Sequence, residues 1–268
     1  MEIEFKNVDF SYEKINYDKK EVLKNINIKF ETGKITSIIG KSGSGKTTML
    51  ELISSIILPT NGEIKITNSN KIGFLFQFPE EQFFNQTVEQ ELEVILKLND
   101  YRKNDNKKRI SDSLKMVGLD NDYLNMNPFN LSNGEKRKVA LASVLILNPS
   151  ILLLDEPTIG LDDKSKKEII NLIRLLKKRY NKTIIIASHD MDFVHKITDY
   201  IFVLDNKKII MEGDKYTIFK KEEELNKINI KIPKLIEFPN KVLRLKKIKI
   251  GYRDDINDLI KDIYRYVK

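Results

Sequence analysis

The stretch GKSGSGKT at residues 40–47 decides the fold of this chain. It matches the pattern GxxxxGK[ST] in full, and it follows the apolar run ITSII at residues 35–39, which predicts a short buried strand. Residues 47–57 then have the pattern of a helix. In such a strand–loop–helix unit the glycines let backbone N–H groups surround phosphates, and the helix N-terminus adds its positive dipole end. The sequence therefore predicts a site for a nucleotide.

Individual residues of this loop have separate expected roles. Lys46 is expected to neutralise the β- and γ-phosphates, and the Thr47 hydroxyl to ligate Mg²⁺. Tyr12 is a candidate to stack on adenine, with a core tyrosine as the alternative. The other residues expected to bind the nucleotide are Gly40, Lys41, Ser42, Gly43, Ser44, Gly45 and Thr48.

A second chemical element stands at residues 151–156, which read ILLLDE. Four apolar residues place Asp155 and Glu156 at the carboxyl end of a buried strand, where α/β folds bind their ligands. Asp155 is expected to support Mg²⁺ either as a direct ligand or through another group that binds the ion. Glu156 is expected to orient or deprotonate the attacking water. Two carboxylates at a strand end also cap helices, but a complete phosphate loop in the same chain favours the catalytic interpretation.

Strands and helices alternate along most of the chain. Alternation of apolar and polar residues over the first 35 or so predicts antiparallel strands around a polar loop at 13–20. Further strands are predicted at 71–77, 151–154, 183–187, 200–204 and 208–211, with helices at 164–180 and 191–197. This order predicts an α/β fold with a largely parallel sheet covered on both faces. Helices at 88–98, 107–117 and 131–147 interrupt the alternation and predict an inserted helical subdomain.

The C-terminal part has a different character. Pro233 and Pro239 are expected to break it, and the final residues carry an apolar stripe at helical spacing. Packing on the chain's own core and contact with a partner both explain such a stripe. Its residues are Ile256, Leu259, Ile260, Ile263 and Val267.

Composition limits the function classes. The chain has 268 residues and no cysteine, which excludes disulfides and thiolate chemistry. No apolar run approaches the roughly 18–20 residues needed to span a bilayer, and the first residues lack the pattern of a signal peptide. Most of the net charge of +8 lies beyond residue 206. Such a basic region suits anionic lipid, nucleic acid or an acidic partner, and equally a solvated surface.

The segment LSNGE at residues 131–135, between the phosphate loop and the acidic strand, identifies the kind of nucleotide protein. This order of elements resembles the ATP-binding-cassette (ABC) ATPases, whose signature segment reads LSGGQ. Asp155 to Thr158 and Gly160 to Asp162 resemble the Walker B motif and D-loop of that family. The resemblance implies a P-loop NTPase fold with a RecA-like core, an antiparallel β subdomain, a helical subdomain at about 88–147 and a short C-terminal helical extension. Residues 1–220 would form the ATP-binding domain and 221–268 the extension.

The same resemblance implies site residues and cofactors. ATP and Mg²⁺ are the expected ligands. Gln77 resembles the Q-loop glutamine, a Mg²⁺ and water contact, and His189 resembles the switch histidine, although a lone histidine is more often structural. Ser132 and Gly134 would contact the nucleotide of the opposite subunit. Asn133 and Glu135 depart from the signature: a glycine-like backbone is expected at Asn133, and added negative charge near the phosphates at Glu135.

A narrower resemblance rests on FQFPEEQFF at 76–84, KRKVALASVLIL at 136–147 and the C-terminal segment. These stretches resemble the ATPase subunits of energy-coupling factor transporters, which power uptake of vitamins and metal ions. The resemblance implies a peripheral protein on the cytoplasmic side of the cell membrane, with a membrane coupling subunit and a substrate-binding membrane subunit. It favours a heterodimer of ATPase subunits over a homodimer. One alternative is an ATPase of another ABC importer or exporter, and a less favoured one is a soluble ABC ATPase that acts on nucleic acid. Nucleic acid is not an expected partner.

Overall fold

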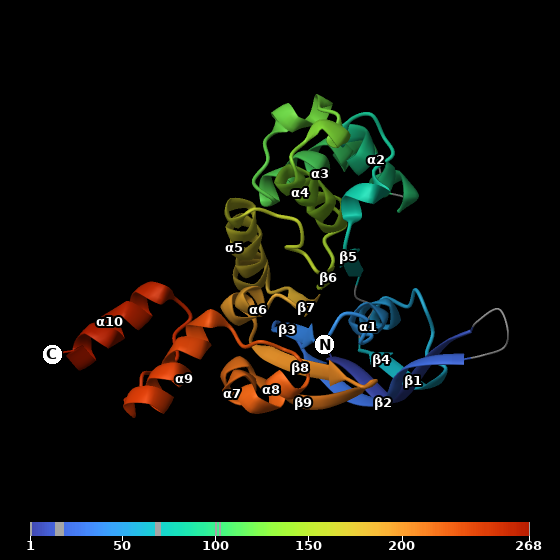
Figure 1. Ribbon diagram of the computed structural model, residues 1–268. Coiled ribbons are helices and arrows are strands. Elements are labelled where there is room, and N and C mark those ends of the chain that lie inside the picture. The colour runs from blue at the N-terminus through green and yellow to red at the C-terminus, as the bar shows by residue number, and fades with distance from the viewer. Residues whose placement is uncertain (1, 14–18, 68–70, 100, 102, 268) are drawn as a thin grey trace.

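The computed structural model describes residues 2–13, 19–67, 71–99, 101 and 103–267 (Figure 1). Its strands form two sheets. The strands are β1 (Glu2–Glu13), β2 (Lys19–Glu31), β3 (Ile35–Ile39), β4 (Asn61–Ile66), β5 (Ile72–Leu75), β6 (Ile151–Asp155), β7 (Thr183–Ala187), β8 (Tyr200–Asp205) and β9 (Lys208–Asp214).

The helices lie between and after these strands. They are α1 (Lys46–Ile53), α2 (Val88–Leu98), α3 (Lys103–Met116), α4 (Asn133–Leu145), α5 (Asp163–Tyr180), α6 (Met191–Ile197), α7 (Lys215–Lys220), α8 (Glu222–Lys227), α9 (Lys234–Lys246) and α10 (Ile256–Val267). Three 3₁₀ helices are η1 (Pro79–Gln82), η2 (Asn121–Asn125) and η3 (Pro128–Asn130). None of the helices in the described ranges combines the length and apolar composition that crossing a bilayer requires.

The larger sheet has the order β5-β6-β7-β3-β8-β9, and all its pairs are parallel except β8 with β9. Side chains alternate between the two faces of a strand. Ile35 and Ile39 of β3 therefore pack in the cluster that includes α4, α5 and α6, whereas Ile38 packs with α1 and the smaller sheet. Every residue of β3, β6 and β7 is buried. The prediction of a parallel sheet covered on both faces is confirmed.

The smaller sheet is antiparallel, with the order β2-β1-β4. Its first two strands agree with the prediction, but β4 was not predicted, because residues 61 and 62 have the composition of a turn. None of the residues of this strand is fully buried. Ile64 and Ile66 are its only apolar residues, and two such residues are too few to predict a strand. Gly62 is needed for the pairing, since a Cβ there would lie 2.2 Å from the carbonyl oxygen of Asn7.

Several predictions for the helices differ from the structure: α3 begins at Lys103 rather than at residue 107, and α4 covers Asn133–Leu145 rather than 131–147. Helix α1 ends at Ile53 rather than at residue 57, because Ser55 takes a left-handed backbone with a φ of 60°. Pro239 does not break the chain but lies inside α9. A proline there removes one backbone hydrogen bond, and burial of Pro239 together with Ile236 on the inner face of α9 offsets that loss.

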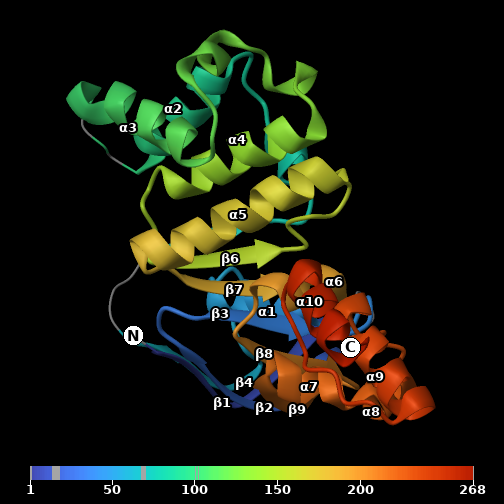
Figure 2. The ribbon, with the colours of Figure 1, turned by 90° about the vertical axis from the view of Figure 1, so that its left-hand side faces the viewer.

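Figures 1 and 2 show where the remaining parts lie. Helices α2, α3 and α4 gather in a lobe at the end of the molecule beyond β5 and β6, while α9 and α10 lie near α6 and α7. The apolar stripe of α10 is divided: Leu259 is buried, but Ile256 and Ile260 are exposed. The side chain of Val267 lies outside the described residues. The division of the chain at about residue 220 remains a prediction.

Candidate functional site

A hollow of about 1740 Å³ opens at the carboxyl ends of the central strands. Most of the residues singled out from the sequence line it, although they come from distant parts of the chain. They are Tyr12, the whole loop from Gly40 to Thr48, Gln77, Asp155, Glu156 and His189. The opposite wall was not predicted: it consists of residues of α8, α9 and the segment between them, among them Asn226, Lys231 and Glu237.

The phosphate loop joins β3 to α1 and depends on two of its glycines. A Cβ on Gly40 would meet the carbonyl oxygen of Leu204 at 2.4 Å, so only glycine lets the loop leave β3 at this point. Gly45 caps α1 with a φ of 107°, a region that side-chain-bearing residues rarely adopt. Helix α1 begins at the hollow, and the backbone N–H groups of a first helical turn have no partner within the helix, which suits an anion site.

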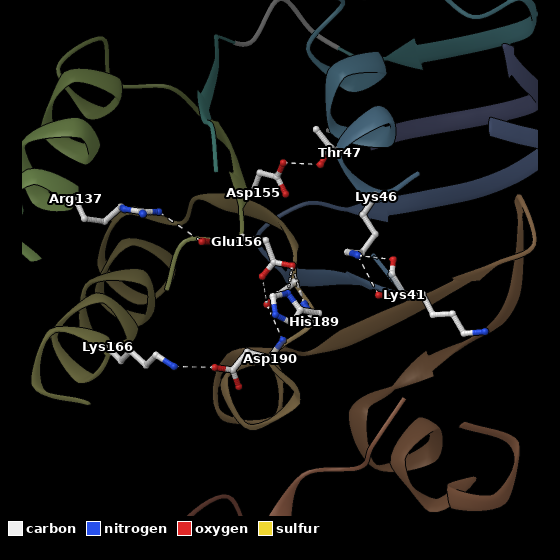
Figure 3. Close-up of polar contacts among 11 residues, drawn as sticks. Lys41, Lys46, Thr47, Arg137, Asp155, Glu156, Lys166, His189 and Asp190 are labelled. Atoms are coloured by element: carbon white, nitrogen blue, oxygen red, sulfur yellow. Dashed lines mark hydrogen bonds and ion pairs between the residues drawn. The ribbon is translucent and has the colours of Figure 1, made fainter. Parts of the chain in front are cut away.

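Lys46 reaches back across this loop. Its Nζ donates to the carbonyl oxygens of Gly40 at 3.0 Å and Lys41 at 2.9 Å (Figure 3). Burial lowers the pKa of Lys46, while the carboxylates of Glu156 and Asp155 oppose that shift. The ammonium group is thus held in a partly desolvated position where a phosphate would interact with it strongly.

Thr47 and Asp155 form the next contact in the hollow. The Thr47 hydroxyl donates to Asp155 Oδ2 at 2.6 Å, which joins the start of α1 to the end of β6 (Figure 3). Burial raises the pKa of Asp155, and the hydrogen bond from Thr47 acts in the opposite direction. A hydroxyl oxygen and a carboxylate are ligands of the kind that Mg²⁺ prefers, so this pair fits a magnesium ion.

Glu156 is held by the loop that follows β7. Its Oε1 accepts from the backbone N–H of His189 at 2.9 Å and lies 2.6 Å from His189 Nδ1, and its Oε2 accepts from the Ser188 hydroxyl at 3.0 Å (Figure 3). Because the carboxylate only accepts, the imidazole is placed to donate through Nδ1. The side chain of Glu156 is 9% exposed and that of His189 is 62% exposed. The pair therefore connects the buried strand end to the open hollow.

The backbone at Glu156 is strained. Its φ of 45° lies in the left-handed region, which costs a non-glycine residue roughly 1–3 kcal/mol. Its N–H donates to the carbonyl oxygen of Ala187 at 2.9 Å, and this bond helps to maintain the conformation. Such strain is found most often at functional sites.

Tyr12 and Gln77 stand at the edges of the hollow. Tyr12 is 41% exposed, and its hydroxyl contacts Thr48 and Glu51, so the alternative of a core tyrosine is wrong. Contact of its ring with adenine remains a prediction. Gln77 follows β5 and lines the hollow, and its backbone carbonyl accepts from Arg137 at 3.2 Å.

The signature segment does not line the hollow of its own chain. Ser132 caps α4, and Gly134 packs so closely on α5 that a Cβ would lie 2.4 Å from Ser165 Oγ. Asn133 is the first residue of α4 and its φ is not positive, so the glycine-like backbone expected there is not adopted. An ordinary helical residue fits this position because the helix already begins here.

Glu135 forms a reciprocal cap with Ser132. Its Oε2 accepts from the Ser132 hydroxyl at 2.6 Å and from the Ser132 N–H at 2.9 Å, and its Oε1 accepts from the Tyr123 hydroxyl at 2.7 Å. The hydrogen bonds from Ser132 and Tyr123 lower the pKa of Glu135, so the negative charge is held at this helix end. The sequence does contain the S-x-x-E spacing that is typical of a capping box, so this cap could have been predicted.

Two other residues of the site were missed. Ser188 precedes His189 at a strand end, which is a weak signal for a contact with Glu156. Arg137 is 1% exposed and contacts the loops after β5 and β6, which no local pattern in α4 predicts. Contacts of this kind depend on how distant segments pack.

Comparison with known proteins agrees with this geometry. The model of the ABC transporter family matches residues 23–159. The energy-coupling factor transporter ATP-binding protein EcfA2 of Clostridium perfringens is 37% identical, with 88% of this chain and 87% of that protein covered.

Two solved structures have the same fold. The cbiO1 protein of Clostridium perfringens, part of the ABC transporter complex cbiONQ, has a TM-score of 0.74 at 30% identity, with 88% of this chain and 97% of that chain covered. The ATP-binding cassette MJ0796, a dimer in a post-hydrolysis state bound to ADP and Pi, has a TM-score of 0.71 at 32% identity, with 79% and 98% covered. The strand–loop–helix unit, the acidic end of β6 and these similarities lead to one conclusion: the chain belongs to the ABC transporter family, among the ATP-binding proteins of energy-coupling factor transporters.

Proposed function

We propose that this chain is the ATP-binding and ATP-hydrolysing subunit of an energy-coupling factor importer. The observation that carries the proposal is the Glu156 carboxylate, which Ser188 and His189 hold in the same hollow as Lys46 and the phosphate loop. A positioned carboxylate, a cation for the phosphates and a ring of backbone N–H groups are the parts that phosphoryl transfer to water requires.

Each group has a distinct role in this mechanism. The loop and the start of α1 bind the phosphates, and Lys46 neutralises the charge on the β- and γ-phosphates. Glu156 accepts a proton from the attacking water or orients it, and His189 keeps the carboxylate in place and faces the γ-phosphate. Tyr12 contacts the adenine. Gln77, which also lines the hollow, would contact the attacking water and Mg²⁺.

Thr47 and Asp155 would hold Mg²⁺, which when bound neutralises charge on the β- and γ-phosphates. We expect Thr47→Val to raise the Mg²⁺ concentration for half-maximal ATP hydrolysis about tenfold, because valine keeps the volume and loses the oxygen. A magnesium titration of the ATPase rate measures this. ATP binding in the presence of a chelator is the control and should change less than about twofold; an unchanged magnesium requirement would contradict the assignment.

The position of Ser132 supports a dimer. It lies outside the hollow of its own chain, and the dimeric MJ0796 cassette is a structural neighbour. Two ATPase subunits would therefore close head-to-tail, with Ser132 and Gly134 of one facing Lys46 of the other across the nucleotide. The partner is a second, different ATPase subunit; a homodimer is the alternative.

Glu135 is expected to weaken the site that this chain completes on its partner. The Ser132 hydroxyl has a single proton, and it donates that proton to Glu135 rather than outward. In Glu135→Gln the negative charge is removed, so the Ser132 hydroxyl is held less strongly and can turn outward. We expect ATP-dependent dimerisation, measured by analytical ultracentrifugation, to become at least about threefold tighter.

Glu93→Gln is the matched control for that experiment. Glu93 lies on α2 of the same helical lobe, pairs with Lys97 and is 41% exposed, so the charge change is equal and is made at a surface ion pair rather than at the cap of α4. Its dimerisation should equal that of the wild type. Weaker dimerisation of Glu135→Gln would show that the carboxylate supports the site.

The membrane partners can be tested directly. The chain would be a peripheral subunit on the cytoplasmic side of the cell membrane, bound to a coupling subunit and a substrate-binding subunit. Phe78 and Phe84, in the segment that follows Gln77, are exposed and support a contact there, since exposed apolar side chains favour a partner. Purification of the tagged chain from solubilised membranes, with mass spectrometry of what accompanies it, is expected to recover both membrane subunits. Recovery with nucleic acid and no membrane protein would contradict the proposal and favour a soluble ABC ATPase.

A further inference from the structure

The largest side chain that the described residues bury completely is Arg137, which is 1% exposed in α4. A buried guanidinium is unfavourable unless its charge is compensated. Burial lowers the pKa of Arg137, and Glu80, whose Oε1 lies 3.5 Å from Nη2, opposes that shift. Glu80 is partly exposed and forms a single long contact, so it compensates the charge only in part.

Three backbone carbonyls compensate the charge further through Nη1 and Nη2, whereas Nε has no partner among the described residues. Nη1 donates to the carbonyl oxygens of Gln77 at 3.2 Å and Glu156 at 3.5 Å, and Nη2 donates to that of Ile159 at 3.4 Å. These carbonyls belong to the segments after β5 and β6 and to the turn before α5. One guanidinium of the helical lobe thus joins two segments of the sheet core, the one after β5 and the one between β6 and α5, as Figure 3 shows for the contact with Glu156.

The contact with Glu156 has a particular consequence. The left-handed backbone of Glu156 is strained and needs support from its surroundings. Its N–H donates to the carbonyl of Ala187, and its C=O accepts from the Ile159 N–H at 3.1 Å and from Arg137 at 3.5 Å, so the residue is held on both sides. The carboxylate extends from this backbone to Ser188 and His189, which hold its oxygens.

We propose that Arg137 is a positioning residue for ATP hydrolysis, which fixes the backbone of Glu156 relative to the loop at Gln77. The inference rests on the proposed role of Glu156. A planar fork with several N–H groups reaches three carbonyls at once, which the single ammonium of lysine does not. The position therefore requires arginine rather than positive charge alone.

The test uses Arg137→Met and Arg137→Lys in the full chain assembled with its partner ATPase subunit. We expect kcat for ATP to fall about 10–100-fold in Arg137→Met, because small misplacements of a reacting group have effects of this size. The affinity for ATP, measured with a fluorescent analogue, should stay within about twofold, because Arg137 does not line the hollow. Arg137→Lys should recover kcat only in part. A merely structural role would lower affinity and the melting temperature together with kcat.

Glu80→Gln is the matched control. It removes the carboxylate partner and keeps the three carbonyl contacts, so kcat is expected to stay near the wild-type value. A loss of kcat in Glu80→Gln equal to that in Arg137→Met would assign the effect to the ion pair and overturn the proposal. Wild-type kcat in a folded Arg137→Met would do the same. If that variant does not fold, Arg137→Lys decides: full kcat overturns the proposal, and a loss of at least about threefold at unchanged ATP affinity supports it.

Glu156→Gln in parallel separates this inference from the proposed function. If Glu156→Gln keeps normal turnover, the role of Glu156 itself is wrong and the proposal for Arg137 falls with it. If Glu156→Gln is inactive while Arg137→Met is fully active, only the inference about Arg137 fails.

Discussion

Replacing Glu156 with glutamine is expected to remove at least about 99% of ATP turnover while ATP still binds, since a positioned general base contributes about 10²–10⁴-fold. The amide has nearly the volume of the carboxylate, and its oxygen still accepts from Ser188 or from the N–H of His189. The local structure should therefore survive. The amide does not take a proton from water, so chemistry stops after nucleotide binding.

Two measurements test this expectation. Phosphate release gives the turnover, and titration with a fluorescent ATP analogue gives the affinity, which should match that of the wild type. Glu212→Gln makes the same chemical change on an exposed residue of β9 outside the hollow, and its turnover should be normal. A Glu156→Gln variant that hydrolyses ATP at the normal rate would refute the assignment of Glu156 as the catalytic carboxylate.

Replacing Lys46 with alanine is expected to weaken ATP binding at least about 100-fold. Hydrogen bonds to charged groups contribute about 1.5–3 kcal/mol each, and a tenfold change in affinity corresponds to 1.4 kcal/mol. Lys46 would form such bonds with two phosphates. It also donates to the carbonyls of Gly40 and Lys41, so its loss also loosens the loop.

Lys34→Ala is the matched control for this variant. Lys34 stands at the other end of β3 from the loop and pairs with Glu31 on the surface, so it removes an equal charge without touching the hollow. Equilibrium titration with an ATP analogue should give wild-type affinity for it. Unchanged ATP affinity in a folded Lys46→Ala protein would refute the phosphate-loop assignment.

The elements that the sequence predicted correctly are those whose signals are local. Strand β7 and helix α2 match the predicted ranges, and the buried β3, β6 and β7 stand out because strands covered on both faces are continuously apolar. The loop at Gly40 to Thr47 was equally clear, since its glycines and its lysine have defined positions relative to one another.

The elements that were missed depend on contacts between distant residues. Strand β4 is half exposed, and its backbone pairs with β1 rather than following an apolar pattern. Arg137 looks like one of several basic residues in α4, and only packing places it inside the protein against the carbonyl of Glu156. The wall of the hollow formed by α8 and α9 lies in the C-terminal segment that contributes to the family resemblance, but no pattern there predicts that it faces the phosphate loop.

The sequence by itself determined which groups are present for the chemistry: the phosphate loop with Lys46 and Thr47, the acidic end of β6 and the LSNGE segment that indicated the family. Their recognition needs only spacing along the chain, because each motif is built from neighbouring residues. The tertiary structure alone decided how these groups are connected. It brought His189 to Glu156 and buried Arg137 between the lobe and the core. Such contacts join residues up to 60 positions apart, and their geometry follows from the packing of strands and helices rather than from any local pattern.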